Sequence, residues 1–347
     1  MLPRARQLIK YLVADGRYDY IETGSLLSIQ KNVSDIVIPS EEKHLELYPL
    51  DFEEFLWALG DESTVPMLKE FFDRKIALGS AVHKKVLNMF RQYILVGGMP
   101  QAVSEYINSK DFYRVDEIKK DILRLYRDDI GKFAGANRNK VLAIFDEIPA
   151  QLSKKEKKYT LASLSKNARL REYEDSFLWL SDAMIINTCF NSTDPNVGLS
   201  LSSDFSTRKC YMADTGLLIS QVFYDNTYAD NTLYKDILFD KLSVNEGMIT
   251  ENVVAQIFRT KGYKLFFYSR RDQKNKDNTM EIDFVLSNNK KIIPVEVKSS
   301  VYRKHSSLDK FNTKFSKRID ESIILYQKDI RIKDGVLHLP IYMAIFL

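Results

Sequence analysis

Two acidic residues and a lysine near the C-terminus stand at positions from which they can act together. Asp283 precedes a polar turn at residues 287–290, and Glu296 and Lys298 follow it. Apolar and polar residues alternate on both sides of the turn, which predicts two strands paired as a hairpin. Side chains of a strand alternate between its faces, so Glu281 shares a face with Asp283, and Glu296 shares one with Lys298. We therefore expect Asp283 and Glu296 to converge, with Lys298 beside them.

Two carboxylates and a lysine at a strand end suit metal-assisted hydrolysis of a phosphodiester. Carboxylates bind hard cations such as Mg²⁺ or Mn²⁺. The cation activates water, and the lysine orients the nucleophile or neutralises charge that develops on the phosphate. Glu251 lies on the preceding predicted helix and can reach the same site from one side. The sequence thus predicts Asp283 and Glu296 as metal ligands, with Lys298 and Glu251 as further catalytic residues.

The same pattern also fits a solvent-facing strand pair with an ordinary surface contact between Glu296 and Lys298. An aspartate followed, after twelve intervening residues, by Glu-x-Lys is a loose pattern. Its place behind a helix that carries Glu251, inside a basic region, favours the metal site. Nearby basic residues are expected to contact phosphates without reading the base sequence. These residues are Arg270, Arg271, Arg303 and Lys304.

Other chemistries find no support in the sequence. It contains no G-x-x-x-x-G-K-[ST] phosphate loop. Neither Cys189 nor Cys210 belongs to a CxxC pair, and the four histidines are scattered along the chain. A zinc site and a Cys–His nucleophile are therefore not predicted.

Composition indicates a globular protein with a sizeable core. The 347 residues are 45% apolar and 28% charged, which suggests two or three domains. Two cysteines are too few for a disulfide framework, so a reducing cytoplasm is the expected compartment. No apolar run approaches the roughly 18–20 residues of a membrane span, and we expect no membrane partner.

The net charge of +4 is unevenly distributed. From Arg259 to the end there are 19 Lys and Arg against 10 Asp and Glu, whereas the remainder has 32 against 37. A basic C-terminal region on an acidic body suits a polyanion such as nucleic acid, although lysine-rich surfaces also serve solubility alone.

The elements before the candidate site are expected to fall into three regions. Residues 1–50 combine a helix with short extended segments at 18–25, 35–39 and 44–48, and residues 51–134 are mainly helical.

Residues 135–225 have the element order of a winged helix, a module that binds DNA or protein. Helices are predicted at 141–152 and 173–183, and a strand at 184–190. The basic stretch 154–158 is expected to be a solvated loop.

Residues 234–347 are predicted to form an α/β (mixed α+β) domain that carries the candidate site. Its expected elements include a helix at 249–258 and strands at 280–286, 291–298 and 338–345. The predicted fold class is a multidomain α/β protein.

Several motifs, in order along essentially the whole chain, resemble a family of prokaryotic AAA-type ATPases with a C-terminal domain of unknown function, DUF4143. The motifs are Glu22-Thr-Gly-Ser-Leu26, Ile36-Val-Ile-Pro-Ser40, Tyr48-Pro-Leu-Asp-Phe-Glu-Glu-Phe55, Val96-Gly-Gly-Met-Pro100, Tyr211-Met-Ala-Asp-Thr-Gly-Leu217, Glu281-Ile-Asp-Phe and Glu296-Val-Lys. This resemblance implies an ATPase core, a helical and winged-helix middle and a restriction-endonuclease-like domain of the PD-(D/E)xK type.

The resemblance also implies roles for individual residues. Asp283 and Glu296 correspond to the metal ligands of that nuclease superfamily, and Lys298 corresponds to its catalytic lysine. Glu251 matches an acidic helix residue that often supplements them. Thr23–Ser25 falls where the ATPase core places a sensor segment that faces a nucleotide phosphate.

One departure from the family pattern changes the expected activity. Met1–Arg6 resembles the stretch directly after the Walker B acidic pair, so the phosphate loop and the magnesium-binding acid are missing from this sequence. We therefore expect this chain neither to bind nor to hydrolyse ATP. Residues 1–50 would be a remnant of the ATPase core with exposed strand edges, either disturbed or buried in an oligomer.

The combined expectation is a truncated ATPase-family protein that cleaves nucleic acid with Mg²⁺ or Mn²⁺. The alternative is a non-catalytic module with a degenerate nuclease fold that binds nucleic acid or protein, or the remnant of a larger ATPase.

Overall fold

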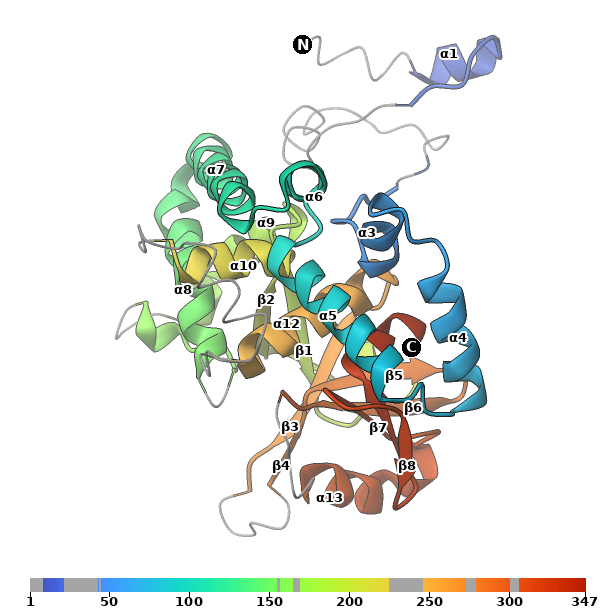
Figure 1. Cartoon of the computed structure of the whole chain (residues 1–347). Helices are drawn as coiled ribbons and strands as arrows, with labels where there is room; N and C mark the ends of the chain where they lie inside the picture. The colour runs from blue at the N-terminus through green and yellow to red at the C-terminus, as the bar shows by residue number, and fades with distance from the viewer. Residues whose placement is uncertain are drawn as a thin grey trace.

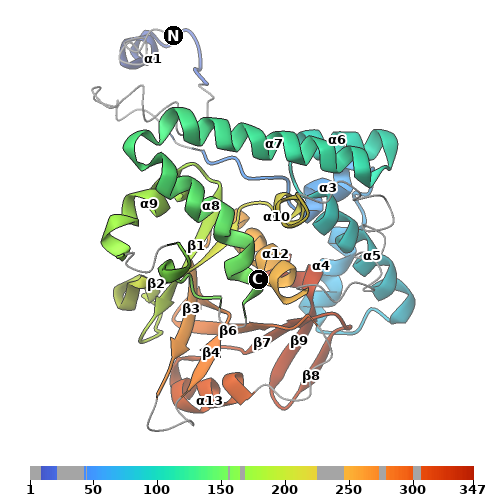
Figure 2. The same cartoon turned by 90° about the vertical axis from the view of Figure 1, so that its left-hand side faces the viewer.

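A layer of helices covers one side of two β-sheets that meet at an angle (Figure 1). The computed structural model describes residues 9–21, 43, 45–154, 157–164, 169–224, 246–272, 279–299 and 306–347. Helix α12 (Glu246–Thr260) lies between the helical layer and the sheets, and α13 (Ser306–Phe315) lies on the opposite side of the sheets (Figure 2). No helix among the described residues is long and apolar enough to span a bilayer.

The region 51–134 is helical, as the sequence predicts. Its helices are α3 (Phe52–Ala58), α4 (Thr64–Arg74), α5 (Ser80–Val96), α6 (Pro100–Ser109) and α7 (Phe112–Phe133). The N-terminal helix α1 (Ile9–Asp15) precedes this region. Helix α3 begins with a capping box, in which the Glu54 N–H donates to Asp51 Oδ1 and the Asp51 N–H donates to Glu54 Oε2, both over 2.9 Å. Pro100 starts α6 at its first turn, where its missing N–H leaves no helical bond unmade.

Predicted strands in the first fifty residues are not found where the structure describes them. Residues 18–21 and 45–48 form no strand, and helix α1 stands apart from the rest of the molecule (Figures 1 and 2). The predicted segment 35–39 and residues Thr23–Ser25 lie outside the described residues.

The middle region contains the two predicted helices and, after them, a strand close to the predicted one. Its elements are α8 (Arg138–Ser153), α9 (Glu174–Asp182), β1 (Ile186–Ser192), β2 (Ser203–Met212) and α10 (Thr215–Val222). Strand β1 pairs antiparallel with β2 and parallel with β3 (Leu265–Arg270). With β4 (Met280–Ile282), these strands form one sheet of order β2-β1-β3-β4, which joins the middle region to the C-terminal region.

The C-terminal region contributes the second, five-stranded sheet, of order β5-β6-β7-β9-β8. Its strands are β5 (Phe284–Asn288), β6 (Lys291–Val297), β7 (Ile323–Tyr326), β8 (Arg331–Lys333) and β9 (Val336–Pro340). The strands β6, β7 and β9 are parallel, and the edge strands are antiparallel to their neighbours. Helices α12 (Glu246–Thr260) and α13 (Ser306–Phe315) complete the region. A parallel neighbour such as β7 requires a crossover after β6, and α13 lies in that connection.

The predicted hairpin is present, but the first of its strands is shorter than predicted. Asn288 pairs with Lys291, and Asn289 takes a φ of 50°, as a two-residue turn requires. The predicted strand 280–286 is interrupted at Asp283, where the chain passes from β4 (Met280–Ile282) in one sheet to β5 in the other. The interruption follows from pairing, because Ile282 pairs with β3 whereas the next strand pairs with β6.

The strand predicted at 338–345 ends at Pro340. The following apolar run, Ile341–Phe346, forms a largely buried 3₁₀ helix. A proline cannot donate a hydrogen bond to a neighbouring strand, which makes it a natural end for β9. The apolar pattern alone does not distinguish a buried strand from a buried helical turn.

A buried aspartate ties the helical layer together. Asp214 caps α10 by accepting the Leu217 N–H over 2.8 Å, and it also accepts the Gly98 N–H over 2.6 Å. A Cβ at Gly216 would lie 2.6 Å from the Cα of Gly97, so the two chain segments approach at glycines. The segments Val96–Pro100 and Tyr211–Leu217 therefore have a structural role here.

Candidate functional site

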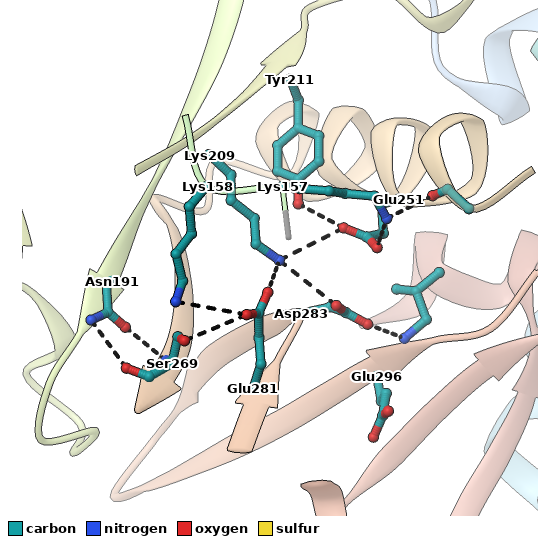
Figure 3. A network of polar contacts seen from close by, with 12 residues as sticks. Lys157, Lys158, Asn191, Lys209, Tyr211, Glu251, Ser269, Glu281, Asp283 and Glu296 are labelled. Atoms are coloured by element: carbon teal, nitrogen blue, oxygen red, sulfur yellow. Dashed lines mark hydrogen bonds and ion pairs between the residues drawn. The ribbon is translucent and has the colours of Figure 1, made fainter. Parts of the chain in front are cut away.

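Three carboxylates surround the ammonium of one buried lysine at the junction of the two sheets (Figure 3). The side chain of Lys209 is 1% exposed, and its Nζ lies 2.9 Å from Glu281 Oε1. The same Nζ lies 3.8 Å from Asp283 Oδ1 and 3.8 Å from Glu251 Oε2. Residues that are far apart in the sequence thus form one charged cluster.

The secondary structure explains why these side chains meet. Lys209 lies in β2 opposite Cys189 of β1, and Cys189 is also paired with β3. The Lys209 ammonium lies 5.0 Å from the centre of the Phe267 ring of β3. Helix α12, which carries Glu251, packs across β2. Asp283 is the residue between β4 and β5, where the chain passes from one sheet to the other. Each element supplies one charged group to the same point.

Further polar groups hold the carboxylate of Glu251. The Tyr211 hydroxyl donates to Glu251 Oε2 over 3.1 Å. Lys157 forms an ion pair with Glu251 Oε1 and donates to the carbonyl of Gly247 over 3.3 Å.

The expectation of a solvated basic loop at residues 154–158 is therefore wrong for two of its lysines. Lys157 is 12% exposed and pairs with Glu251, and the Lys158 ammonium lies 3.9 Å from Glu281 Oε2. The physical reason is electrostatic, because the carboxylates of Glu251 on α12 and Glu281 on β4 attract these two lysines. Residues 155–156 lie outside the described part of the chain.

Glu296 and Lys298 form a second pair on β6 and the residue after it. Lys298 Nζ donates to Glu296 Oε1, and the Lys298 N–H donates to the carbonyl of Leu325 on β7 over 2.8 Å. The Glu296 side chain is 8% exposed, and its Oε2 has no hydrogen-bond partner among the described residues. Figure 3 shows its carboxylate pointing away from Lys209.

Asp283 lies between these two groups. Its Oδ2 accepts the Val297 N–H over 2.9 Å, which holds the carboxylate against the β6 backbone one residue from Glu296. Burial raises the pKa of Asp283 to about 7, and the negative charges of Glu251 and Glu296 act in the same direction. The ammonium groups of Lys209 and Lys157 oppose this increase in pKa.

The pKa values of the lysines and of Glu281 show how strongly the charges interact. Burial tends to lower the pKa of Lys209, but Glu251, Glu281 and Asp283 outweigh it and raise that pKa above its ordinary value. Burial also tends to raise the pKa of Glu281, but its contacts with Lys209 and Lys158 lower it. The ammonium of Lys209 is therefore charged at neutral pH.

The other residues predicted for the site are only partly described. Arg270 ends β3 and is exposed, and the exposed Arg271 follows it. Arg303, Lys304 and the sensor segment Thr23–Ser25 lie outside the described residues.

Sequence reasoning missed Lys209 and Tyr211 as members of the cluster. One feature of the sequence could have pointed to Lys209, because it stands directly before the apolar run Cys210–Ala213. The residues of that run are all buried in the structure. A charged residue next to such a run in a strand is rarely buried unless it is paired.

The carboxylates have the donor chemistry that Mg²⁺ or Mn²⁺ prefers. Among the described residues no three His, Cys, Asp or Glu side chains gather as a ready-made metal site. Mg²⁺ is commonly held by one or two carboxylates, with waters and substrate phosphates as the other ligands. Glu296 fits that requirement, since its Oε2 is a buried acceptor without a partner among the described residues, and Asp283 is the other carboxylate on this side of β6.

Comparisons with known proteins identify two regions of the chain. Residues 87–227 match a family described as a domain of unknown function, DUF8612. Residues 246–343 match the domain of unknown function DUF4143. No curated protein and no solved structure matches the chain. The second match supports a DUF4143 domain in the C-terminal part of this protein, and that domain contains Glu251, Glu281, Asp283, Glu296 and Lys298.

Proposed function

We propose that the DUF4143 domain of this chain is a metal-dependent nuclease that hydrolyses phosphodiester bonds in nucleic acid. In this proposal the domain has the restriction-endonuclease-like PD-(D/E)xK fold, and the chain is related to AAA-type ATPases. The observation that carries the proposal is the buried Glu296 carboxylate: Lys298 pairs with its Oε1, and its Oε2 has no hydrogen-bond partner among the described residues.

An unpartnered buried carboxylate oxygen is costly, because it has lost its hydration and gained no hydrogen bond. A cluster that serves stability alone would be expected to satisfy it. A bound cation would satisfy it here, and negative charge nearby would favour that cation, because Glu296 lies close enough to Asp283 to raise the pKa of Asp283.

Asp283 and Glu296 would hold the cation in this proposal. A divalent cation bound there supplies Lewis-acid chemistry and lowers the pKa of a bound water. The Val297 N–H fixes the Asp283 carboxylate, so its orientation does not depend on the metal. Lys298 holds a positive charge next to Glu296, where it can contact a substrate phosphate.

The charge distribution supports a polyanionic substrate. The region from Arg259 to the end carries a clear excess of basic residues, and Arg270 and Arg271 are exposed at the end of β3. Contacts from such residues to phosphates provide affinity without sequence preference.

The test is cleavage of labelled single- and double-stranded DNA and RNA in Mg²⁺ or Mn²⁺. We expect cleavage by the unaltered protein, and a loss of about 100-fold or more in Asp283→Asn and in Lys298→Ala. Lys291→Ala is the matched control, because Lys291 is an exposed lysine at the start of β6, the strand that Lys298 follows. It should stay within about threefold of the unaltered protein. Absence of cleavage by folded protein on every substrate, or equal activity in all variants, contradicts the proposal.

A second candidate is a non-catalytic module that binds nucleic acid or protein. It is favoured by the charge balance, because Glu251, Glu281, Asp283 and Glu296 face four lysines, at positions 157, 158, 209 and 298. This candidate predicts nucleic-acid binding in EDTA without cleavage, and no Mn²⁺ binding by the unaltered protein.

A further inference from the structure

We propose that Lys209 is a built-in cation of the site. Its ammonium takes the place that a divalent ion would otherwise take among Glu251, Glu281 and Asp283, so the site has room for only one metal ion. The inference deepens the proposed nuclease function and rests on it for its catalytic meaning. The geometric claim, that Lys209 and a divalent ion exclude each other, is tested separately.

The first argument is the position of the ammonium. Nζ lies within 3.8 Å of an oxygen from each of three carboxylates, which come from α12, from β4 and from the β4–β5 junction. The distance to Glu281, 2.9 Å, is that of a hydrogen bond, whereas the other two are ion-pair distances. The Lys209 ammonium is therefore shared by all three carboxylates.

Besides Lys209, few positive groups lie close to Asp283 and Glu281. Asp283 also accepts the Val297 N–H, but its only ion pair among the described residues is with Lys209. The other ammonium near Glu281 is that of Lys158, at 3.9 Å. Without Lys209, Asp283 would have no ion-pair partner among the described residues and Glu281 would have only Lys158, and carboxylate oxygens left in this way are the ligands that hard cations prefer.

The third argument is that Lys209 cannot readily move away. Its side chain leaves the middle of a paired strand, is 1% exposed, and lies against the Phe267 ring. Lys298, in contrast, follows the end of β6 and is 27% exposed. Lys209 is thus a positioning residue that holds the carboxylates, whereas Lys298 is the lysine that can reach a substrate.

The test compares Mn²⁺ stoichiometry in the unaltered full chain, in Lys209→Met and in Lys119→Met, by electron paramagnetic resonance of free Mn²⁺. Lys119 is the matched control because it is also 1% exposed, but its ammonium donates to the carbonyl of Leu95. We expect Lys209→Met to bind one Mn²⁺ more per chain than the unaltered protein. Lys119→Met should bind the same number as the unaltered protein.

The additional ion should depend on Glu281, the most accessible of the three acids. In the double variant with Lys209→Met and Glu281→Gln we expect the additional Mn²⁺ to be lost. If Lys209→Met binds no more Mn²⁺ than the unaltered protein, the inference is wrong. A gain that persists in the double variant also contradicts it, since the ion would then be elsewhere.

A thermal measurement covers the case in which Lys209→Met folds poorly without metal. Mn²⁺ at 1 mM should raise its melting temperature by about 5 °C more than that of the unaltered protein. An equal shift in both overturns the inference. The outcome is separable from the nuclease proposal, because a gain of one Mn²⁺ in a protein that cleaves nothing leaves the role of Lys209 intact.

Discussion

Lys119 on α7 and Lys209 on β2 are equally buried, yet their pKa values move in opposite directions. Burial lowers the pKa of Lys119 to about 8, and the nearby charges of Asp116 and Asp214 only partly offset it. Around Lys209 three carboxylates more than offset burial, and the pKa rises. The difference lies in what the neighbouring acids are bound to.

The acids near Lys119 are engaged elsewhere. Asp116 pairs with Lys120 over 2.9 Å, and Asp214 accepts backbone N–H groups of Gly98 and Leu217. Those contacts join chain segments, which is what a structural element needs. The acids near Lys209 are bound mainly by other charged side chains, at a place that is partly open to solvent. Groups with strongly perturbed pKa values and charged partners are typical of functional sites.

The largest loss of stability is expected at Asp214, which joins segments of the helical layer. Asp214→Ala should lower the free energy of unfolding by about 3 kcal/mol or more, because two buried N–H groups lose their acceptor. Urea denaturation measures the change. Asp111→Ala removes a helix cap from α7 at an exposed position and should cost about 1 kcal/mol. Equal losses in the two variants would show that Asp214 is an ordinary cap.

Replacement of Lys209 by methionine should lower the free energy of unfolding more than replacement of Lys119 does. In metal-free buffer Lys209→Met should lose about 3 kcal/mol, because it removes the ion pair of Asp283 and one ion pair each of Glu251 and Glu281. Lys119→Met should change stability by about 1 kcal/mol or less, since removal of a poorly compensated charge offsets the lost hydrogen bond to Leu95. Urea denaturation of both variants would contradict the comparison if Lys119→Met were the less stable one.

The smallest expected effect is the pH dependence of stability, which has opposite signs at Asp283 and at Lys119. The folded-state pKa of Asp283 lies above its ordinary value of 3.8, at about 7, so the folded state binds more protons between those values. Its contribution to stability is present below pH 4 and is lost as the pH rises through 7. The folded-state pKa of Lys119 lies below its ordinary value of 10.5, so stability rises between about pH 8 and 10.5.

Single variants separate the two contributions. Asp283→Asn should flatten the fall in the free energy of unfolding between pH 4 and 7, by less than about 1.4 kcal/mol per pH unit. Lys119→Met should remove the rise at alkaline pH. A steeper fall in Asp283→Asn than in the unaltered protein would show that the sign is wrong.

Much of the local structure follows from the sequence. Periodic apolar residues locate α8 and α12, and the polar turn locates the β5–β6 hairpin. These elements depend on neighbours in the sequence. The interruption at Asp283 does not, because it is decided by two different sheets competing for adjacent residues.

The site shows the same division. Glu296 and Lys298 are two residues apart, and their pairing follows from strand alternation. Lys209 and Lys157 come from another region and reach Glu251 only because β1 pairs with β3 and α12 packs on β2. No short-range pattern contains that pairing, so the central cation of the cluster was not predicted.

The most direct test of the nuclease proposal is a Mn²⁺ titration of the unaltered protein and of Glu296→Gln, followed by electron paramagnetic resonance. The substitution keeps the size of the side chain and removes its charge. We predict one Mn²⁺ per chain in the unaltered protein, bound at least about tenfold more weakly in Glu296→Gln. Equal affinity in the two proteins, or no Mn²⁺ bound by either at millimolar concentration, would contradict a metal site at Asp283 and Glu296.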